Sequence, residues 1–333
     1  MKRLFVFILF TAFLSSVFGC KNQGTKKPEP KKSVIAVIPK GTTHEFWKSV
    51  HAGANRAGQE FGVEIIWKGP LKEDDREAQI KVVEDFITRG VSGIVLAPLD
   101  DTALRAPVAN AVKSGIPVVI IDSGLKSDDF ISFVATDNYK GGTLAGEHLA
   151  KLLGGKGKVI LLRYQEGSAS TTEREQGFLD AIAKFPEIEV KSSNQFGGAT
   201  VETAFQASEN LLASFKNRDG SLTIQGIFCP NLSTAFGMLR ALQEGGFAGK
   251  VKFVGFDSTE KFLEALKNGE MDALILQNPM LMGYLGVKTM VEHLQGKPVE
   301  KRIDTGVYLV TKENMDTPEI KELLNPDLTK WER

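Results

Sequence analysis

This sequence has few cysteines and no net charge. The 333 residues include only two cysteines, and Cys229 lies in an apolar run that is typical of a buried thiol. A disulfide framework is therefore not expected. The 41 basic and 41 acidic side chains cancel, so the formal net charge is zero at pH 7. This balance gives no indication of binding to nucleic acid or to anionic lipid.

Histidine is scarce as well, and no catalytic motif is complete. His44-Glu45 begins like a zinc-protease helix, but the second histidine is missing. The glycines around Lys156 lack the spacing and the Ser or Thr of a phosphate-binding loop, and the Ser-x-x-Lys spacing that starts at Ser123 arises by chance. We therefore expect no enzyme activity, no cofactor and no metal, because metal-ligand spacing is absent among the four histidines, His44, His51, His148 and His293.

No apolar run near the N-terminus is long enough to span a membrane comfortably. Residues 4–18 are largely apolar, follow Lys2-Arg3 and end in small residues, which is the pattern of a secretory signal. The tetrapeptide that ends at Cys20 resembles the lipobox of bacterial lipoproteins, although Phe18 is bulkier than the usual residue. An ordinary signal peptide and a signal anchor are the alternatives.

The lipobox resemblance implies how the N-terminal region is organised. Residues 1–19 would be a removed signal peptide, and the mature chain would begin at a lipidated Cys20. A lipid on Cys20 anchors a protein to the membrane without spanning it. Residues 20–32 would then be the lipid anchor and a flexible tether, because they are rich in Lys and Pro and lack apolar periodicity.

From Ser33 onward, strand-like and helix-like segments alternate. Runs of branched apolar residues at 34–38, 93–97 and 118–121 are typical of strands buried on both faces. Between such runs, apolar residues recur at helical spacing, and glycine follows where a helix needs a left-handed cap. The pattern continues through the second half, and the length suits two domains. The sequence therefore predicts an α/β fold with parallel sheets covered on both faces by helices.

Two of the predicted strands end in the same dipeptide, Asp-Ser. Asp122 follows the run 118–121, and Asp257 follows the run 253–256. An unpaired carboxylate is costly beside a packed core, so each acid is expected at the carboxyl end of its strand, facing a crevice. The alternative is that each Asp-Ser caps the following helix. The repetition favours two lobes that face one cleft.

Several short motifs occur in an order that resembles a known family, over about residues 34–310. They are Phe46-Trp47, Ala97-Pro98-Leu99-Asp100, Asp122, Asp137-Asn138 with Gly141-Gly142, Glu173-Arg174 before Gly177-Phe178, Pro230-Asn231, Gly255-Phe256-Asp257 and Leu276-Gln277. The set resembles the periplasmic sugar-binding proteins of ABC importers, of the ribose-binding type, whose core is shared with the lac-repressor family. One such motif is weak, but the ordered set is specific.

The resemblance implies the type I periplasmic binding protein fold. Two Rossmann-like lobes with parallel sheets would be joined by a three-segment hinge near Asp137, Asn278 and Asp304. Lobe 1 would comprise residues 34–136 plus 278–303. Lobe 2 would comprise residues 137–277 plus 304–333.

The resemblance also implies which residues bind the ligand. Side chains with several donors or acceptors suit neighbouring sugar hydroxyls, and aromatic rings suit the apolar faces of the sugar. The implied polar ligands are Asp122, Arg174, Asn231, Asp257 and Gln277, and the implied stacking rings are Phe46, Trp47 and Phe196. For Phe46 and Trp47, core packing of the first helix is the alternative.

Lys40 and His44 depart from the ribose type. The segment around Pro39-Lys40 is more similar to the receptors for autoinducer-2 and rhamnose, in which a lysine at this position bonds the ligand. Lys40 and His44 are therefore added to the predicted site, with a solvated lysine at the lip of the cleft as the alternative. We hypothesise that Lys40 and Arg174 balance Asp122 and Asp257 around a neutral polyol.

The function implied is that of an extracytoplasmic solute-binding lipoprotein. It would capture a small sugar or polyol as a monomer and deliver it to an ABC permease, with the lipid as its only membrane contact and without nucleic acid. A sensory receptor that signals to another protein, for example for autoinducer-2, is one alternative. A transcriptional regulator is another, but a signal peptide and tether occupy the place of its DNA-binding segment.

Overall fold

The computed structural model describes Met1, residues 32–328 and residues 330–331. The predicted signal peptide beyond Met1, the predicted lipidation site Cys20 and the tether up to residue 31 lie outside the described residues. In the described part of the chain, no helix combines the length and the apolar character needed to cross a bilayer.

The described chain forms two six-stranded sheets. In the first sheet every neighbouring pair is parallel, in the order β11 (Arg302–Asp304), β5 (Ser132–Ala135), β4 (Val118–Ile121), β3 (Gly93–Leu96), β1 (Val34–Ile38) and β2 (Glu64–Trp67). The second sheet has the order β12 (Tyr308–Val310), β10 (Ala273–Leu276), β9 (Lys252–Phe256), β8 (Gly226–Phe228), β6 (Lys156–Arg163) and β7 (Glu187–Phe196). Only β12 among these is antiparallel to its neighbour.

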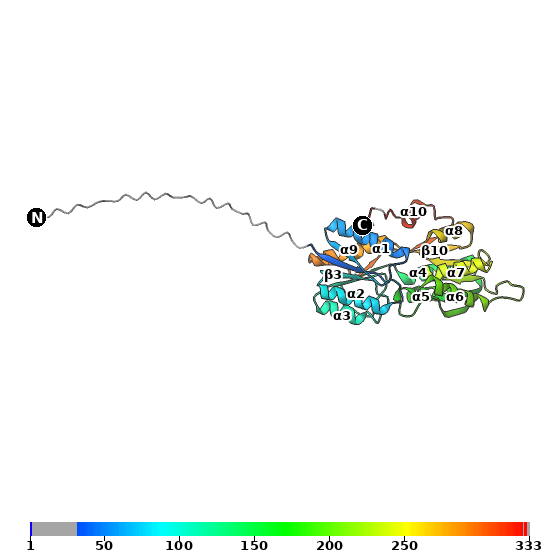
Figure 1. Cartoon of the computed structure of the whole chain (residues 1–333). Helices are drawn as coiled ribbons and strands as arrows, with labels where there is room; N and C mark the ends of the chain where they lie inside the picture. The colour runs from blue at the N-terminus through cyan, green and yellow to red at the C-terminus, as the bar shows by residue number, and fades with distance from the viewer. Residues whose placement is uncertain (2–31, 329, 332–333) are drawn as a thin grey trace. The chain divides into compact units, whose positions relative to one another are not determined.

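Helices cover both faces of the first sheet, which we call lobe 1 together with its helices (Figure 1). Alternate residues of β1 enter different cores: Ile35 and Val37 pack in one, and Ala36 and Ile38 in the other. The first core is covered by α1 (Glu45–Phe61) and α9 (Pro279–Leu294), and the second by α2 (Arg76–Arg89) and α3 (Arg105–Lys113). Burial on both faces explains why the strands are continuous apolar runs.

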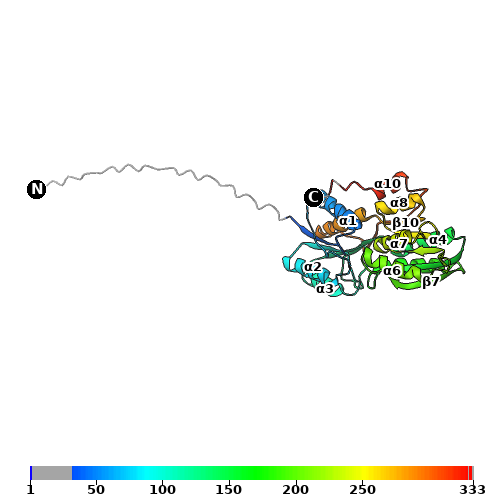
Figure 2. The same ribbon diagram turned by 45° about the vertical axis from the view of Figure 1, so that its right-hand side comes forward.

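The second sheet is covered in the same way, and we call it lobe 2 (Figure 2). One face packs against α4 (Asn138–Leu152) and α5 (Ala169–Ile182). The other packs against α6 (Val201–Ala213), α7 (Leu232–Glu244), α8 (Glu260–Asn268) and α10 (Pro318–Leu324). Gly142 lets α4 and α5 approach closely, because a Cβ added there would lie 1.9 Å from the carbonyl oxygen of Arg174.

The chain passes between the two sheets three times, and the predicted hinge residues lie at these crossings. The side chain of each of these residues accepts a hydrogen bond from a backbone N–H group two or three residues further along the chain. The carboxylate of Asp137 accepts from Lys140 N, the amide oxygen of Asn278 accepts from Leu281 N, and the carboxylate of Asp304 accepts from Gly306 N. Two of these bonds cap α4 and α9, so each helix begins at a crossing.

Two helix starts differ from the sequence-based expectation in a way that matters for the cleft. Apolar residues at helical spacing predict one helix from about Glu73, but this helix begins at Arg76 behind the cap Asp75, which leaves Glu73 in the preceding loop. The same spacing predicts another helix from about Glu173 to Phe185, but this helix begins earlier, at Ala169, so Arg174 lies in its second turn. Polar, weakly periodic residues at both starts obscure the boundary in the sequence.

The described end of the chain returns to lobe 1. After α10 packs on the core of lobe 2, the backbone oxygen of Trp331 accepts a hydrogen bond of 2.8 Å from Asn55 of α1. The predicted boundary placed all residues after Asp304 in lobe 2, so this contact adds a link between the lobes outside the three crossings.

Candidate functional site

Asp122 and Asp257 lie at the carboxyl ends of β4 and β9, one in each lobe. Both are buried, with 4% and 8% of their surface exposed. Both have left-handed backbone conformations, with φ of 62° and 67°, and they are the only residues other than glycine with positive φ in the described chain. Aspartate tolerates this conformation better than most side chains, but it still carries strain of about 1 kcal/mol or more. The turn of the backbone points both carboxylates into one cleft.

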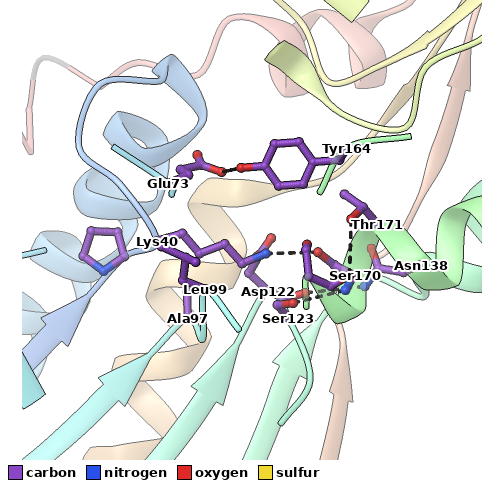
Figure 3. Close-up of polar contacts among 12 residues, drawn as sticks. Lys40, Glu73, Ala97, Leu99, Asp122, Ser123, Asn138, Tyr164, Ser170 and Thr171 are labelled. Carbon is purple, nitrogen blue, oxygen red and sulfur yellow. Dashed lines mark hydrogen bonds and ion pairs between the residues drawn. The ribbon is translucent and has the colours of Figure 1, made fainter. Parts of the chain in front are cut away.

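Lys40 follows β1 in lobe 1 and is buried beside Asp122. Its Nζ atom lies 2.8 Å from Asp122 Oδ2 and donates to Ser170 Oγ of lobe 2 at 3.1 Å (Figure 3). Only 4% of Lys40 is exposed, so it is not a solvated lysine at the lip of the cleft. A buried lysine needs such partners, because an unpaired buried charge is strongly destabilising.

Arg174 of α5 is the main cation of lobe 2. Its Nε atom donates to Asn138 Oδ1 and its Nη1 atom to the carbonyl oxygen of Pro230, both at 2.9 Å. The guanidinium lies 3.9 Å from the ring centroid of Phe256. These contacts fix the plane of the guanidinium, although burial lowers the pKa of Arg174 against the opposing effect of nearby acids.

Asp257 and Gln277 form a pair on the wall of lobe 2. Asp257 accepts from Gln277 Nε2 at 2.9 Å and from Leu232 N at 3.1 Å. Burial raises the pKa of Asp257, although Arg174 and Gln277 oppose the rise. The Oε1 atom of Gln277 is buried and has no hydrogen-bond partner in the described part of the molecule. A buried polar atom of this kind is rare unless a ligand or water completes it.

Asn231, an implied ligand residue, has a structural role as well as a place in the cleft. It lines the cleft, and its side chain also caps α7 by accepting from Thr234 N at 3.3 Å. Its Nδ2 atom donates to Ser233 Oγ at 3.0 Å. The same side chain is therefore a helix cap and a wall of the cleft.

Phe46 and Trp47 both line the cleft, but they differ in environment. Their rings pack edge to face with centroids 4.9 Å apart. Trp47 is 3% exposed and belongs to the core of lobe 1, and its Nε1 atom donates to Glu73. Core packing therefore accounts for most of Trp47, and Phe46 is the less buried ring.

Phe196 is a correction to the predicted set. It ends β7 at the edge of the second sheet, is 37% exposed, and lies outside the group of residues that line the cleft. The Arg163 guanidinium lies 4.7 Å from its ring centroid. The sequence pattern predicts a strand over residues 188–191, whereas β7 continues to Phe196 and keeps this ring on the edge.

Glu73 is a cleft residue that the sequence analysis missed. Its Oε1 atom accepts from Trp47 Nε1 at 2.6 Å and lies 2.8 Å from His44 Nδ1, and its Oε2 atom accepts from the Tyr164 hydroxyl at 2.7 Å. Burial by itself raises the pKa of Glu73, but His44, Lys40 and Trp47 outweigh it and lower that pKa to about 2. Burial by itself lowers the pKa of His44, but Glu73 raises it above its ordinary value.

Apart from Phe196, the predicted ligand-binding residues all line one cleft between the lobes. The lining contains three cationic or titratable basic side chains, Lys40, His44 and Arg174, and three acids, Glu73, Asp122 and Asp257. The hypothesised balance of two cations and two acids therefore extends to three of each. The cavity measures about 30 Å³, which is about the volume that one water molecule occupies in liquid water.

Tyr164, Ser170, Thr171 and Leu232 also line the cleft. No motif in the sequence indicated them, because only folding brings them to the cleft. No group of His, Cys, Asp and Glu in the described chain has a metal-holding arrangement.

Comparison with known proteins places this geometry in a family. Residues 35–298 match the periplasmic binding protein domain. The ribose import binding protein of Haemophilus influenzae is 31% identical over 84% of this chain and 92% of its own. A carbohydrate transporter solute-binding protein from Agrobacterium radiobacter, solved with D-arabinose, is 35% identical with a TM-score of 0.84, covering 89% of this chain and all of that one. One from Agrobacterium vitis, solved with D-fucose, is 37% identical with a TM-score of 0.82, covering 88% of this chain and all of that one. The predicted two-lobed α/β fold is confirmed.

We expect Glu73→Gln to destabilise the protein in a pH-dependent way. The pKa of Glu73 falls from 4.5 to about 2 on folding, which corresponds to ~3 kcal/mol of stability. Because the folded pKa is the lower one, this stability is present above the unfolded pKa and is lost as the pH falls toward 2. Urea denaturation should show a loss near that size at pH 7 and less than half of it at pH 3.

The matched control is Asp85→Asn, which removes an exposed carboxylate paired with Lys68. Little change is expected at either pH, because exposed ion pairs contribute little. An equal loss for Glu73→Gln at both pH values would contradict the assignment of its effect to charge.

Proposed function

The chain belongs to the family of periplasmic sugar-binding proteins of the ribose-binding type, and on that premise we propose that it captures a neutral monosaccharide or polyol between its lobes. It would pass this ligand to the permease of an ABC importer. Uncharged ligands are named for several relatives, including D-arabinose, D-fucose and myo-inositol. These names describe the relatives and support the same ligand class here.

The observation that carries the proposal is the composition of the cleft. Side chains from both lobes converge on it, and their three acidic and three basic groups leave no surplus charge for an ionic ligand when His44 carries its proton, a state that its contact with Glu73 favours. Carboxylate, amide and guanidinium groups each bond neighbouring hydroxyls, and the buried Oε1 atom of Gln277 offers a further acceptor. A neutral, hydroxyl-rich molecule fits this set better than an anion or a cation.

We propose that the ligand enters by separation of the lobes about the three crossings. A cavity of about 30 Å³ does not admit a monosaccharide while the lobes touch. Asp122 lies in lobe 1 and Asp257 in lobe 2, so a sugar bonds both only when they approach each other. The ligand thus favours the closed arrangement by its differential affinity for it.

Ligand class is tested by a thermal-shift screen over pentoses, hexoses, deoxysugars, polyols, autoinducer-2 and matched sugar acids. A neutral sugar or polyol should raise the melting temperature, because a ligand at 100 times its dissociation constant adds about 2.7 kcal/mol of stability. Each sugar acid should shift it less than its neutral parent. A stabilising sugar acid whose neutral parent has no effect would overturn the proposal of a neutral ligand.

Lys40 is proposed to bond the ligand directly. Lys40→Met keeps an unbranched side chain one atom shorter and removes the ammonium group, so the affinity for the sugar found in the screen should fall about 10- to 100-fold. Titration calorimetry measures the change. The control is Lys68→Met, which breaks the exposed Lys68–Asp85 pair in the same lobe and should leave affinity unchanged. An unchanged affinity for Lys40→Met would remove Lys40 from the site.

Membrane attachment is proposed to occur through a lipid on Cys20, with the binding domain outside the cytoplasm. Cys20→Ser should release the protein from the membrane fraction and abolish labelling by a fatty-acid analogue. Cys229→Ala is the matched control, because Cys229 is a buried free thiol and is not available for modification. Continued fatty-acid labelling of Cys20→Ser would contradict the assignment.

A further inference from the structure

The carboxylate of Glu73 is held from two sides, and the two sides belong to different lobes. His44 and Trp47, which contact its Oε1 atom, lie at the start of α1 and therefore in lobe 1, like Glu73 itself. These contacts persist when the lobes separate, because all three residues move together. The carboxylate is therefore oriented by lobe 1 alone.

The Oε2 atom of Glu73 is contacted from lobe 2. Tyr164 follows directly after β6, and its hydroxyl donates to Oε2 at 2.7 Å, as Figure 3 shows. The neighbouring Gln165 donates from Nε2 to the backbone oxygen of Glu73 at 2.8 Å. Two consecutive residues of lobe 2 therefore donate hydrogen bonds to one residue of lobe 1. Both bonds break when the lobes separate.

The Tyr164 contact is strong for physical reasons. Tyr164 is 1% exposed and Glu73 is 8% exposed, so water competes little for either group. Burial raises the pKa of Tyr164, so the phenol keeps its proton, while Glu73 remains ionised and accepts it. A hydrogen bond to an ionised acceptor is about twice as strong as a neutral one.

The contact also differs from other polar contacts between the lobes, which include donation by Ser170 N to Ser123 Oγ and by Arg76 Nη2 to the backbone oxygen of Glu166. Lys40 reaches Ser170 of lobe 2, but its charge is paired with Asp122 within lobe 1. In the Glu73–Tyr164 contact, the acceptor is already oriented and the donor comes wholly from the opposite lobe. Closure therefore gains one charge-assisted bond without reorganising lobe 1.

We propose that the hydrogen bond between Glu73 and Tyr164 is a latch that sets how often the two lobes close, and thereby scales the affinity for every ligand by one common factor. Glu73 and Tyr164 act as positioning residues for the binding site. The inference rests on the proposed function in one respect, namely that a sugar binds to the closed lobes. Apparent affinity is then proportional to the fraction of molecules able to close.

The test uses Tyr164→Phe, which removes only the hydroxyl oxygen. Titration calorimetry with each sugar or polyol that binds the wild-type protein should show affinities lowered about 10- to 100-fold, by the same factor within about threefold. Tyr139→Phe is the matched control, because the Tyr139 hydroxyl donates to Asp180 within lobe 2. Its affinities should be unchanged.

Two calorimetric results would overturn the latch. Unchanged affinities for Tyr164→Phe would mean that the bond does not govern closure, including the case in which only the melting temperature falls. Factors that differ widely between sugars would make Tyr164 a ligand contact instead.

Small-angle X-ray scattering without added sugar separates this test from the proposed function. Tyr164→Phe should show a larger radius of gyration than the wild-type protein and Tyr139→Phe. If no sugar bound any variant, the proposed function would fail, and this comparison would still decide on the latch. In that case, equal radii for all three proteins would overturn it.

Discussion

The cost of removing charge from water governs the arrangement of this cleft. Lys40, Glu73, Asp122, Arg174 and Asp257 are all at least nine-tenths buried, and a buried charge without partners would destabilise the fold by several kcal/mol. Each of these side chains therefore has a bonded partner, such as Asp122 for Lys40 or Gln277 for Asp257. Because the partners come from both sheets, the burial of these charges depends on the approach of the two lobes.

Residues that position the backbone also form the walls of the site. Asn231 caps α7 and lines the cleft. Asp257 also lines it and accepts from Leu232 N in the first turn of the same helix. These bonds fix the rotamers of both side chains, so little conformational freedom remains to be lost when a ligand binds. A structural role and a position in the site are therefore combined in one side chain.

The sequence predicted the fold well because periodicity and strand-end signals are local. Asp122, Asp257 and Arg174 were identified because each belongs to a motif that resembles a family. Glu73 and Tyr164 were missed because their contact joins positions far apart in the chain, and Glu73 was assigned to a helix that begins at Arg76. Phe196 was misplaced because the edge strand β7 extends beyond the apolar run that indicated it. Long-range contacts and strand ends therefore limited the prediction.

The left-handed backbone of Asp122 and Asp257 limits how this site diversifies. Glycine, asparagine and aspartate tolerate such a conformation, whereas β-branched and bulky side chains do so rarely. Replacement of either aspartate is therefore nearly confined to asparagine, which loses the charge, and glycine, which loses the side chain. A change of sugar preference during evolution is easier through neighbours with ordinary backbones, such as Ser170 and Thr171 in α5. The two acids act as fixed points of the pocket, and the residues around them supply its variation.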